Sequence, residues 1–87
     1  MYFVYVLYSL KFERTYTGMT KDLKKRIKEH NTKQNKSTKA YVPWKLILME
    51  EFETRIEARV REKYLKSGNG REYLKTTINK WPRGATE

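Results

Sequence analysis

The stretch YFVYVLY, residues 2–8, is an unbroken run of apolar and aromatic residues, rich in types that favour strands. Such a run predicts a strand that is covered on both faces of its sheet. Because side chains alternate along a strand, Tyr5 shares one face with Phe3 and Leu7. The other four residues of the run point to the opposite face.

Working outward from this run, the sequence predicts two further strands and a first helix. The strands are RTYTGM at 14–19 and WKLILMEEF at 44–52. Thr20 is the predicted N-cap of a helix that has Asp22 in its first turn and ends near Asn31. A polar, basic loop separates this helix from the third strand.

Two more helices are predicted in the second half of the chain. Thr54 and Glu57 form the S/T-x-x-E pattern of a capping box, which opens the second helix. The stretch SGNG ends this helix, because its residues tolerate positive φ. The remaining boundaries are a helix end near Lys66, a third helix from about Arg71 to Lys80 and a tail at 81–87. The predicted order is β-β-α-β-α-α, an α/β (α+β) fold.

The length and composition indicate one small domain. Eighty-seven residues allow a single core and no separate module, and we expect that core within about residues 2–77. The sequence has no cysteine, which fits a reducing compartment. It has no N-terminal apolar run long enough for a signal peptide or a membrane span, so the expected location is the cytoplasm.

A strong positive charge dominates the composition. Twenty Lys and Arg residues against ten Asp and Glu residues give a formal net charge of +10, concentrated in residues 1–40. Such a charge suits a polyanion, because phosphate contacts release condensed counterions. Nucleic acid is therefore the expected partner, although solubility alone explains part of the charge. No membrane is expected, because no predicted helix pairs a basic face with exposed Trp, Phe or Leu.

The second strand carries Tyr16 and Gly18 on one face. A glycine inside a strand usually marks a bulge or a close approach of the backbone, and beside a tyrosine it leaves the phenol uncovered. The alternative is that Gly18 only marks the end of the strand before a turn at Thr20.

The first helix places two polar residues near its buried side. Leu23 and Ile27 define that side, and His30 lies roughly 20° and Arg26 roughly 60° from Leu23 on a helical projection. The histidine is either a packed, hydrogen-bonded side chain or a functional one. Burial of the arginine is costly without an anion, so it requires a carboxylate or a phosphate.

The second helix offers such a carboxylate in Glu62. It projects between Ala58 and Leu65, on the side roughly opposite Ile56 and Val60. With apolar residues on two sides of the helix, we expect Glu62 to be half-buried. It forms either a salt bridge with Arg26 or a ligand for Mg²⁺, which often takes one acidic ligand plus water and phosphate.

Together, Tyr5, Tyr16, Arg26, His30 and Glu62 suffice for phosphodiester hydrolysis. Attacking water needs a base, the pentacovalent phosphate needs cationic stabilisation and the leaving oxygen needs a Lewis acid. A tyrosine acts as base only if cations lower its pKa, since an unperturbed phenol titrates at about 10. Arg26 and a bound metal are expected to lower it.

At these residues the sequence resembles the GIY-YIG nuclease superfamily, in its small single-domain branch of bacteria and archaea. The similar segments, over about residues 2–77, are FVY (3–5), YTG (16–18), RIKEH (26–30), STKAYVPWKL (37–46), EKYLK (62–66) and LKSGNGREYL (65–74). The resemblance implies a three-stranded antiparallel sheet flanked by helices. It also implies a DNA endonuclease that depends on one Mg²⁺ (or Mn²⁺) ion.

The resemblance also implies a role for each of the five residues. Tyr5 is the general base or orients the attacking water, and Tyr16 hydrogen-bonds the scissile phosphate or its neighbours. Arg26 stabilises the phosphorane, His30 assists Tyr5 or the phosphate, and Glu62 holds the metal.

The sequence departs from the family pattern at three positions, where Phe3 replaces a glycine, Thr17 an isoleucine and Met19 a lysine found in some relatives. Without that lysine, activation of Tyr5 depends more on Arg26 and His30. The loop after the first helix either contacts phosphate or is simply solvated. Its candidate contacts are Lys33, Lys36, Ser37, Thr38 and Lys39.

Three functions remain open at this point. The first is a nuclease acting on DNA rather than RNA, with structured or damaged DNA in repair or recombination as candidate substrates. The second is a nucleic-acid-binding module with little or no turnover, and the third is a small accessory factor that binds RNA or protein. Because the chain has no room for an extra DNA-binding domain, targeting is expected from the basic loop, a homodimer or a partner protein.

Overall fold

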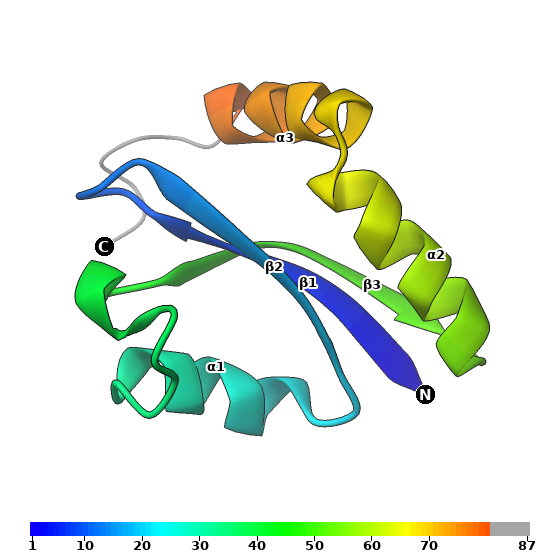
Figure 1. The fold of residues 1–87 in the computed structure, drawn as a ribbon, viewed down its shortest axis with the longest axis horizontal. Coiled ribbons are helices and arrows are strands. Elements are labelled where there is room, and N and C mark those ends of the chain that lie inside the picture. The colour runs from blue at the N-terminus through cyan, green and yellow to red at the C-terminus, as the bar shows by residue number, and fades with distance from the viewer. Residues whose placement is uncertain (81–87) are drawn as a thin grey trace.

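The computed structural model of the protein describes residues 1–80 and is built on a three-stranded antiparallel sheet (Figure 1). The strands are β1, Tyr2–Ser9; β2, Arg14–Thr20; and β3, Lys45–Phe52. Their order is β2-β1-β3, so the apolar run forms the central strand. The predicted fold class is confirmed, and the predicted tail at 81–87 lies outside the described residues.

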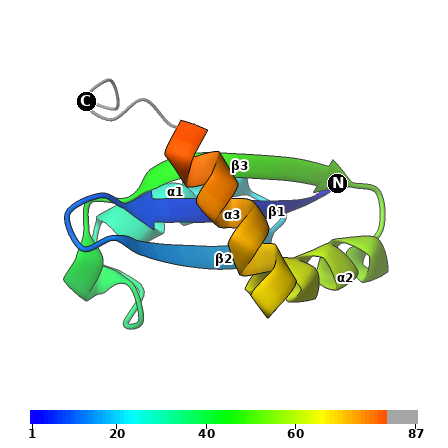
Figure 2. The same ribbon diagram turned by 90° about the horizontal axis from the view of Figure 1, so that it is seen from above.

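Helices cover both faces of this sheet. One face carries α1, Leu23–Asn31, and the short 3₁₀ helix η1, Lys39–Tyr41, whereas α2, Arg55–Lys66, and α3, Gly68–Lys80, lie on the other (Figure 1). Figure 2 shows α3 crossing the strands, with α2 displaced toward the β2 side of the sheet. The edge of β2 therefore lies between the two layers of helices.

Two small cores form on the two faces, because the central strand is apolar at every position. Beneath α2 and α3 lie Val4, Val6, Tyr8, Ile47, Ala58, Leu65 and Leu74, all buried. Beneath α1 lie Tyr5, Leu7 and Trp44, packed against half-buried partners that include Tyr16, Leu23 and Ile27. Tyr5 therefore shares a face with Leu7, as the alternation predicts.

The first helix begins later than predicted. Its N-cap is Asp22, whose carboxylate accepts a hydrogen bond from the Lys25 amide at 3.1 Å, and not Thr20. Thr20 is the last residue of β2, and its hydroxyl accepts a hydrogen bond from the Asp22 amide at 3.0 Å. The capping box of the second helix is confirmed, since Thr54 and Glu57 make both of its hydrogen bonds.

The break between α2 and α3 is shorter than predicted. Only Ser67, in an extended conformation, separates the two helices, and the glycines of SGNG belong to the first turn of α3. Gly70 is buried, and a Cβ atom there would lie within 2.5 Å of Leu65 Cα. Its role is to let α3 start close against the end of α2.

The side of α2 that carries Ile56 and Val60 faces solvent. These side chains are 77% and 64% exposed, so the prediction that apolar contacts cover two sides of α2 is wrong. Only Ala58 and Leu65 are buried, because the helix packs on a single face of the sheet. Among residues 1–80, no helix is both long enough and apolar enough to cross a membrane.

Candidate active site

Three of the five candidate side chains form a cluster of rings on the α1 face. In the register of the sheet, Tyr5 is paired with Gly18 and Tyr16 with Leu7, so both phenols point to the same side. His30 comes from the last turn of α1. The ring centroids of Tyr16 and His30 are 4.7 Å apart, those of Tyr5 and His30 are 5.9 Å apart and those of the two tyrosines are 6.3 Å apart.

The phenol of Tyr5 lies across Gly18. A Cβ atom on Gly18 would be 2.5 Å from the Tyr5 hydroxyl oxygen, closer than any side chain tolerates. Because β2 continues to Thr20, the alternative that Gly18 marks the end of the strand is wrong. The glycine instead lets the Tyr5 hydroxyl reach from the central strand toward the edge of the sheet.

A buried chain of hydrogen bonds fixes His30. Its Nε2 lies 3.0 Å from the Tyr5 hydroxyl, and its Nδ1 lies 2.8 Å from the Thr38 hydroxyl. The Thr38 hydroxyl donates to the Asn35 carbonyl at 3.5 Å, which leaves it to accept from Nδ1–H. Nε2 is then the acceptor of the Tyr5 proton, and all three linked side chains are fully buried.

Thr38 is therefore not one of the surface contacts to phosphate that we predicted for the loop. It is 1% exposed, and its carbonyl accepts a hydrogen bond from the Trp44 indole at 3.0 Å. Asn31 holds the same loop, because its side chain bonds the backbone of Trp44. The other loop candidates, Lys33, Lys36, Ser37 and Lys39, are exposed, and their contact with phosphate stays a prediction.

The two titratable groups of this hydrogen-bonded chain, the Tyr5 phenol and the His30 imidazole, are uncharged at neutral pH. Burial raises the pKa of the Tyr5 phenol, with the nearby Tyr16 adding to the shift and Arg26 opposing it. Burial also lowers the pKa of His30, and Arg26 acts in the same direction. Arg26 lowers the pKa of Tyr5, as expected, but the loss of hydration outweighs the attraction of this one cation, so the pKa lies above its usual value.

Arg26 lies on α1 one turn before His30, with 41% of its side chain exposed. Its guanidinium forms an ion pair with Glu29 at 3.6 Å, so it is neither deeply buried nor paired with Glu62. The alternative of a salt bridge between Arg26 and Glu62 is therefore wrong. The exposed part of the guanidinium remains open to an anion from solvent.

Glu62 approaches the site from α2, on the other side of the sheet. Its side chain is 13% exposed and forms ion pairs with Lys66 at 3.2 Å and with Arg59 at 3.9 Å. Its charge nevertheless acts on the Tyr5 hydroxyl, whose pKa it raises. Charges from both layers of helices, Arg26 on α1 and Glu62 on α2, therefore reach the same hydroxyl.

The side chains of the site offer too few ligands to hold a metal without oxygens from a substrate. Residues 1–80 contain no group of three or more His, Asp or Glu side chains arranged to hold an ion. A single carboxylate is nevertheless a common protein ligand for Mg²⁺, which fills its remaining positions with water and phosphate oxygens. Use of Glu62 as such a ligand requires its ion pairs with Lys66 and Arg59 to open.

Comparison with known proteins gives a consistent result. The model of the GIY-YIG catalytic domain matches residues 1–77. The UPF0213 protein CPE1444 of Clostridium perfringens is 46% identical over 67 residues, 76% of this chain and 71% of that protein. The UPF0213 protein YazA of Bacillus subtilis is 44% identical over 66 residues, 75% of this chain and 66% of that protein.

A solved structure agrees with these sequence relatives. The solution NMR structure of the UPF0213 protein BH0048 from Bacillus halodurans is similar with a TM-score of 0.53 at 32% sequence identity. The match covers 87% of this chain and 84% of that one. The chain therefore belongs to the GIY-YIG catalytic domain family, whose members form a superfamily of endonucleases.

Proposed function

We propose that this protein is a metal-dependent endonuclease that hydrolyses phosphodiester bonds of DNA. The observation that carries the proposal is the hydrogen-bonded chain from Tyr5 through His30 to Thr38, with the charges of Arg26 and Glu62 acting on the Tyr5 hydroxyl. Buried polar groups are hydrogen-bonded in any folded protein, so the support for catalysis comes from the two charges, Arg26 and Glu62, that act on the Tyr5 hydroxyl from different helices.

The proton of the attacking water leaves through Tyr5. Because the phenol is neutral, it passes its own proton to Nε2 of His30, 3.0 Å away, as it accepts the proton of the water. His30 is ready to accept, since its lowered pKa keeps the imidazole neutral and Thr38 holds its Nδ1–H. No stable phenolate is needed.

The remaining residues stabilise the phosphate. Arg26 projects beside the rings with its guanidinium partly exposed and neutralises charge on the phosphorane. Tyr16 is half-buried next to His30 and hydrogen-bonds a phosphate oxygen. Glu62 would hold Mg²⁺ or Mn²⁺, which supplies Lewis acidity to the phosphate and the leaving oxygen when bound.

Further properties follow from the same proposal. DNA is favoured over RNA, with structured or damaged DNA in repair or recombination as the candidate substrate, and the cytoplasm is the proposed location. A homodimer or a partner protein would supply targeting, since residues 1–80 form a single sheet with its helices. A binding module with little turnover is the second candidate, and the ion pairs of Glu62 with Lys66 and Arg59 favour it.

One substitution distinguishes the two candidates. Supercoiled plasmid, branched DNA and single strands are incubated with the protein in Mg²⁺ or in EDTA, and nicking is followed on gels. We expect cleavage only with metal, and a loss of at least roughly 100-fold in Glu62→Gln. The matched control is Glu50→Gln, which removes another partly buried ion pair of α2, with Arg61 at 2.7 Å, and should keep full activity.

The other outcomes are equally clear. If the wild type and Glu62→Gln both bind DNA, and neither cleaves any substrate in Mg²⁺ or Mn²⁺, the protein is a binding module. If Glu62→Gln cleaves as fast as the wild type in Mg²⁺, Glu62 is not a metal ligand.

A further inference from the structure

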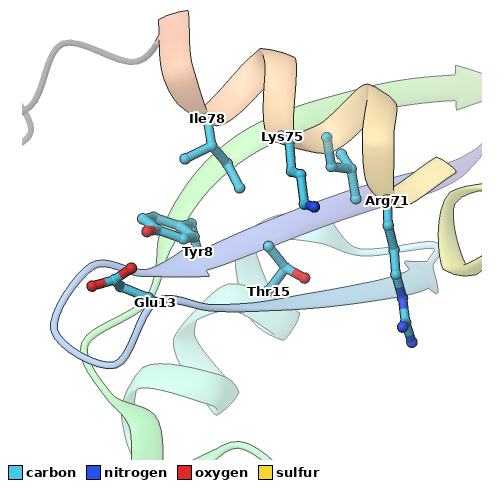
Figure 3. Close-up of a pocket in the computed structure, with 7 residues that line it drawn as sticks. Tyr8, Glu13, Thr15, Arg71, Lys75 and Ile78 are labelled. Carbon is cyan, nitrogen blue, oxygen red and sulfur yellow. The ribbon is translucent and has the colours of Figure 1, made fainter. Parts of the chain in front are cut away.

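A cavity of about 380 Å³ opens on the α3 face of the sheet, away from the ring cluster (Figure 3). This volume is in the range of small-molecule binding sites. Its floor is apolar and its rim carries two cations, one carboxylate and one hydroxyl. The lining residues are Tyr8, Leu74 and Ile78 at the floor and Glu13, Thr15, Arg71 and Lys75 at the rim.

Shared lining residues connect this α3 cavity to two further hollows around the edge of β2, toward residues of the candidate active site. A neighbouring hollow shares Thr15 and Arg71 with the cavity and is also lined by Tyr16 and Lys66. A third hollow, around Glu62, shares Lys66 with the second. The three together form a path, the β2-edge groove, from Glu62 past Tyr16 to the α3 cavity.

The groove is open because β2 is an edge strand among the described residues. No strand pairs with its outer side, so a ligand can pass from one face of the sheet to the other. Figure 3 shows the Arg71 side chain extending from α3 past β2 at this point. Arg71 thus stands at the junction of the active site and the α3 cavity.

The charge of the groove suits a polyanion. Five cations line the three hollows against two carboxylates, and the cations are Arg59, Lys63, Lys66, Arg71 and Lys75. Arg71 forms no ion pair within residues 1–80, and Lys75 pairs only with the largely exposed Glu72. A guanidinium without an internal partner is well suited to bind a phosphate through two parallel hydrogen bonds.

We propose that the α3 cavity binds a nucleotide of the DNA strand that is cleaved, several bonds away from the scissile phosphate. The base packs on the floor formed by Tyr8, Leu74 and Ile78, and the adjacent phosphate lies between Arg71 and Lys75. This subsite rests on the proposed function, because it continues the path of the same strand. It adds a contact that holds the strand in register as it crosses the edge of the sheet.

The test uses the intact ¹⁵N-labelled protein in EDTA, so that binding is measured without cleavage. Single-stranded oligodeoxythymidylate and a duplex of equal length are titrated, and amide shifts are mapped by NMR. We expect shifts at Thr15, Lys66, Arg71, Lys75 and Ile78 with at least one of the two probes. Arg71→Gln should weaken that binding roughly tenfold.

Arg55→Gln is the matched control, because Arg55 is also exposed at the surface but lies outside the three hollows. Its loss of DNA affinity should be only the small loss that removal of one distant positive charge causes. Shifts confined to α1 and the loop at 32–43, with equal affinity of the two variants, would overturn the subsite and leave the proposed nuclease intact. Shifts in the α3 cavity without any cleavage in Mg²⁺ would support the subsite and overturn the nuclease. Absence of binding to either probe would overturn the subsite, whereas the proposed nuclease is decided by the cleavage assay in Mg²⁺.

Discussion

The Tyr5 hydroxyl experiences two opposing influences. Burial raises its pKa and keeps it protonated, whereas the hydrogen bond to His30 offers its proton an acceptor at 3.0 Å. In the proposed mechanism, the buried phenol passes its proton to His30 without existing as a free anion. The direction of that transfer depends on which nitrogen of His30 carries hydrogen. Thr38 fixes this tautomer, because its hydroxyl accepts the hydrogen bond of Nδ1–H.

Thr38→Val tests this control of the tautomer. The change keeps the shape of the side chain but removes the acceptor for Nδ1–H, which would then be buried without a partner. We expect the proton of His30 to move to Nε2, so that this nitrogen no longer accepts from Tyr5, and the cleavage rate to fall by roughly 100-fold. Multiple-bond ¹H–¹⁵N spectra of the single histidine, recorded well above its pKa, report the tautomer directly.

Thr38→Ser is the matched control, since it retains the hydroxyl. It should keep the Nδ1–H tautomer and most of the cleavage rate. A valine variant with an unchanged histidine spectrum would show that Thr38 does not set the tautomer, whatever its effect on stability.

At this scale the sequence predicted which residues gather but not how they are joined. Strand alternation and helical projection, which are regular repeats, predicted the faces that Tyr5, Tyr16 and His30 take on their own elements, whereas the meeting of these faces was implied only by the family resemblance. Thr38 lies in an irregular loop, where no repeat shows which side chain turns inward. Its hydrogen bond to His30 depends on how Trp44 and Asn31 hold that loop, and only the folded chain reveals this.

At the scale of elements, the junction of α2 and α3 depends on the size of one residue. A Cβ atom on Gly70 would clash with the Tyr64 carbonyl and the Leu65 backbone, neither of which can rotate away. Gly70→Ala should therefore destabilise the protein by about 1–3 kcal/mol, as overpacking does in a dense core. Urea unfolding followed by circular dichroism measures the change.

Gly68→Ala is the control within the same helical turn. A Cβ atom on Gly68 meets nothing within 4 Å, so its effect should stay within about 0.5 kcal/mol. Equal effects of the two alanines would mean that close approach of α3 to α2 is not what Gly70 provides.

The same junction shows which features of the helices and strands could be predicted from the sequence and which could not. All three strands and all three helices were predicted in the right order, because apolar runs and the capping box of Thr54 and Glu57 are strong local signals. The SGNG segment was interpreted as a linker. A glycine that allows close packing inside a helix and a glycine that ends a helix look alike in sequence, and only the contact with Leu65 separates them.

At the scale of the whole molecule, the candidate functional residues are divided between the two faces of the sheet. The α1 face carries the rings and Arg26, and the α2 and α3 face carries Glu62 and the α3 cavity. The edge of β2 connects them, which is why a bound strand would have to cross that edge. The net charge of +10 favours binding of a polyanion, but a net charge alone does not identify the surface that is used.

Salt dependence identifies the contribution of the basic loop to that surface. If Lys36 and Lys39 contact phosphates, their replacement together by glutamine should reduce the slope of log affinity for duplex DNA against log salt by about 1.8, since each contact contributes about 0.9. Both are exposed and lie within two residues of Thr38, whose hydroxyl is hydrogen-bonded to His30. Fluorescence anisotropy in EDTA over a series of salt concentrations gives the slope.

A Lys11→Gln and Arg55→Gln double variant has the same net charge and should leave the slope nearly unchanged. Equal slopes for the two double variants would mean that the loop is only solvated and that the strand is held elsewhere.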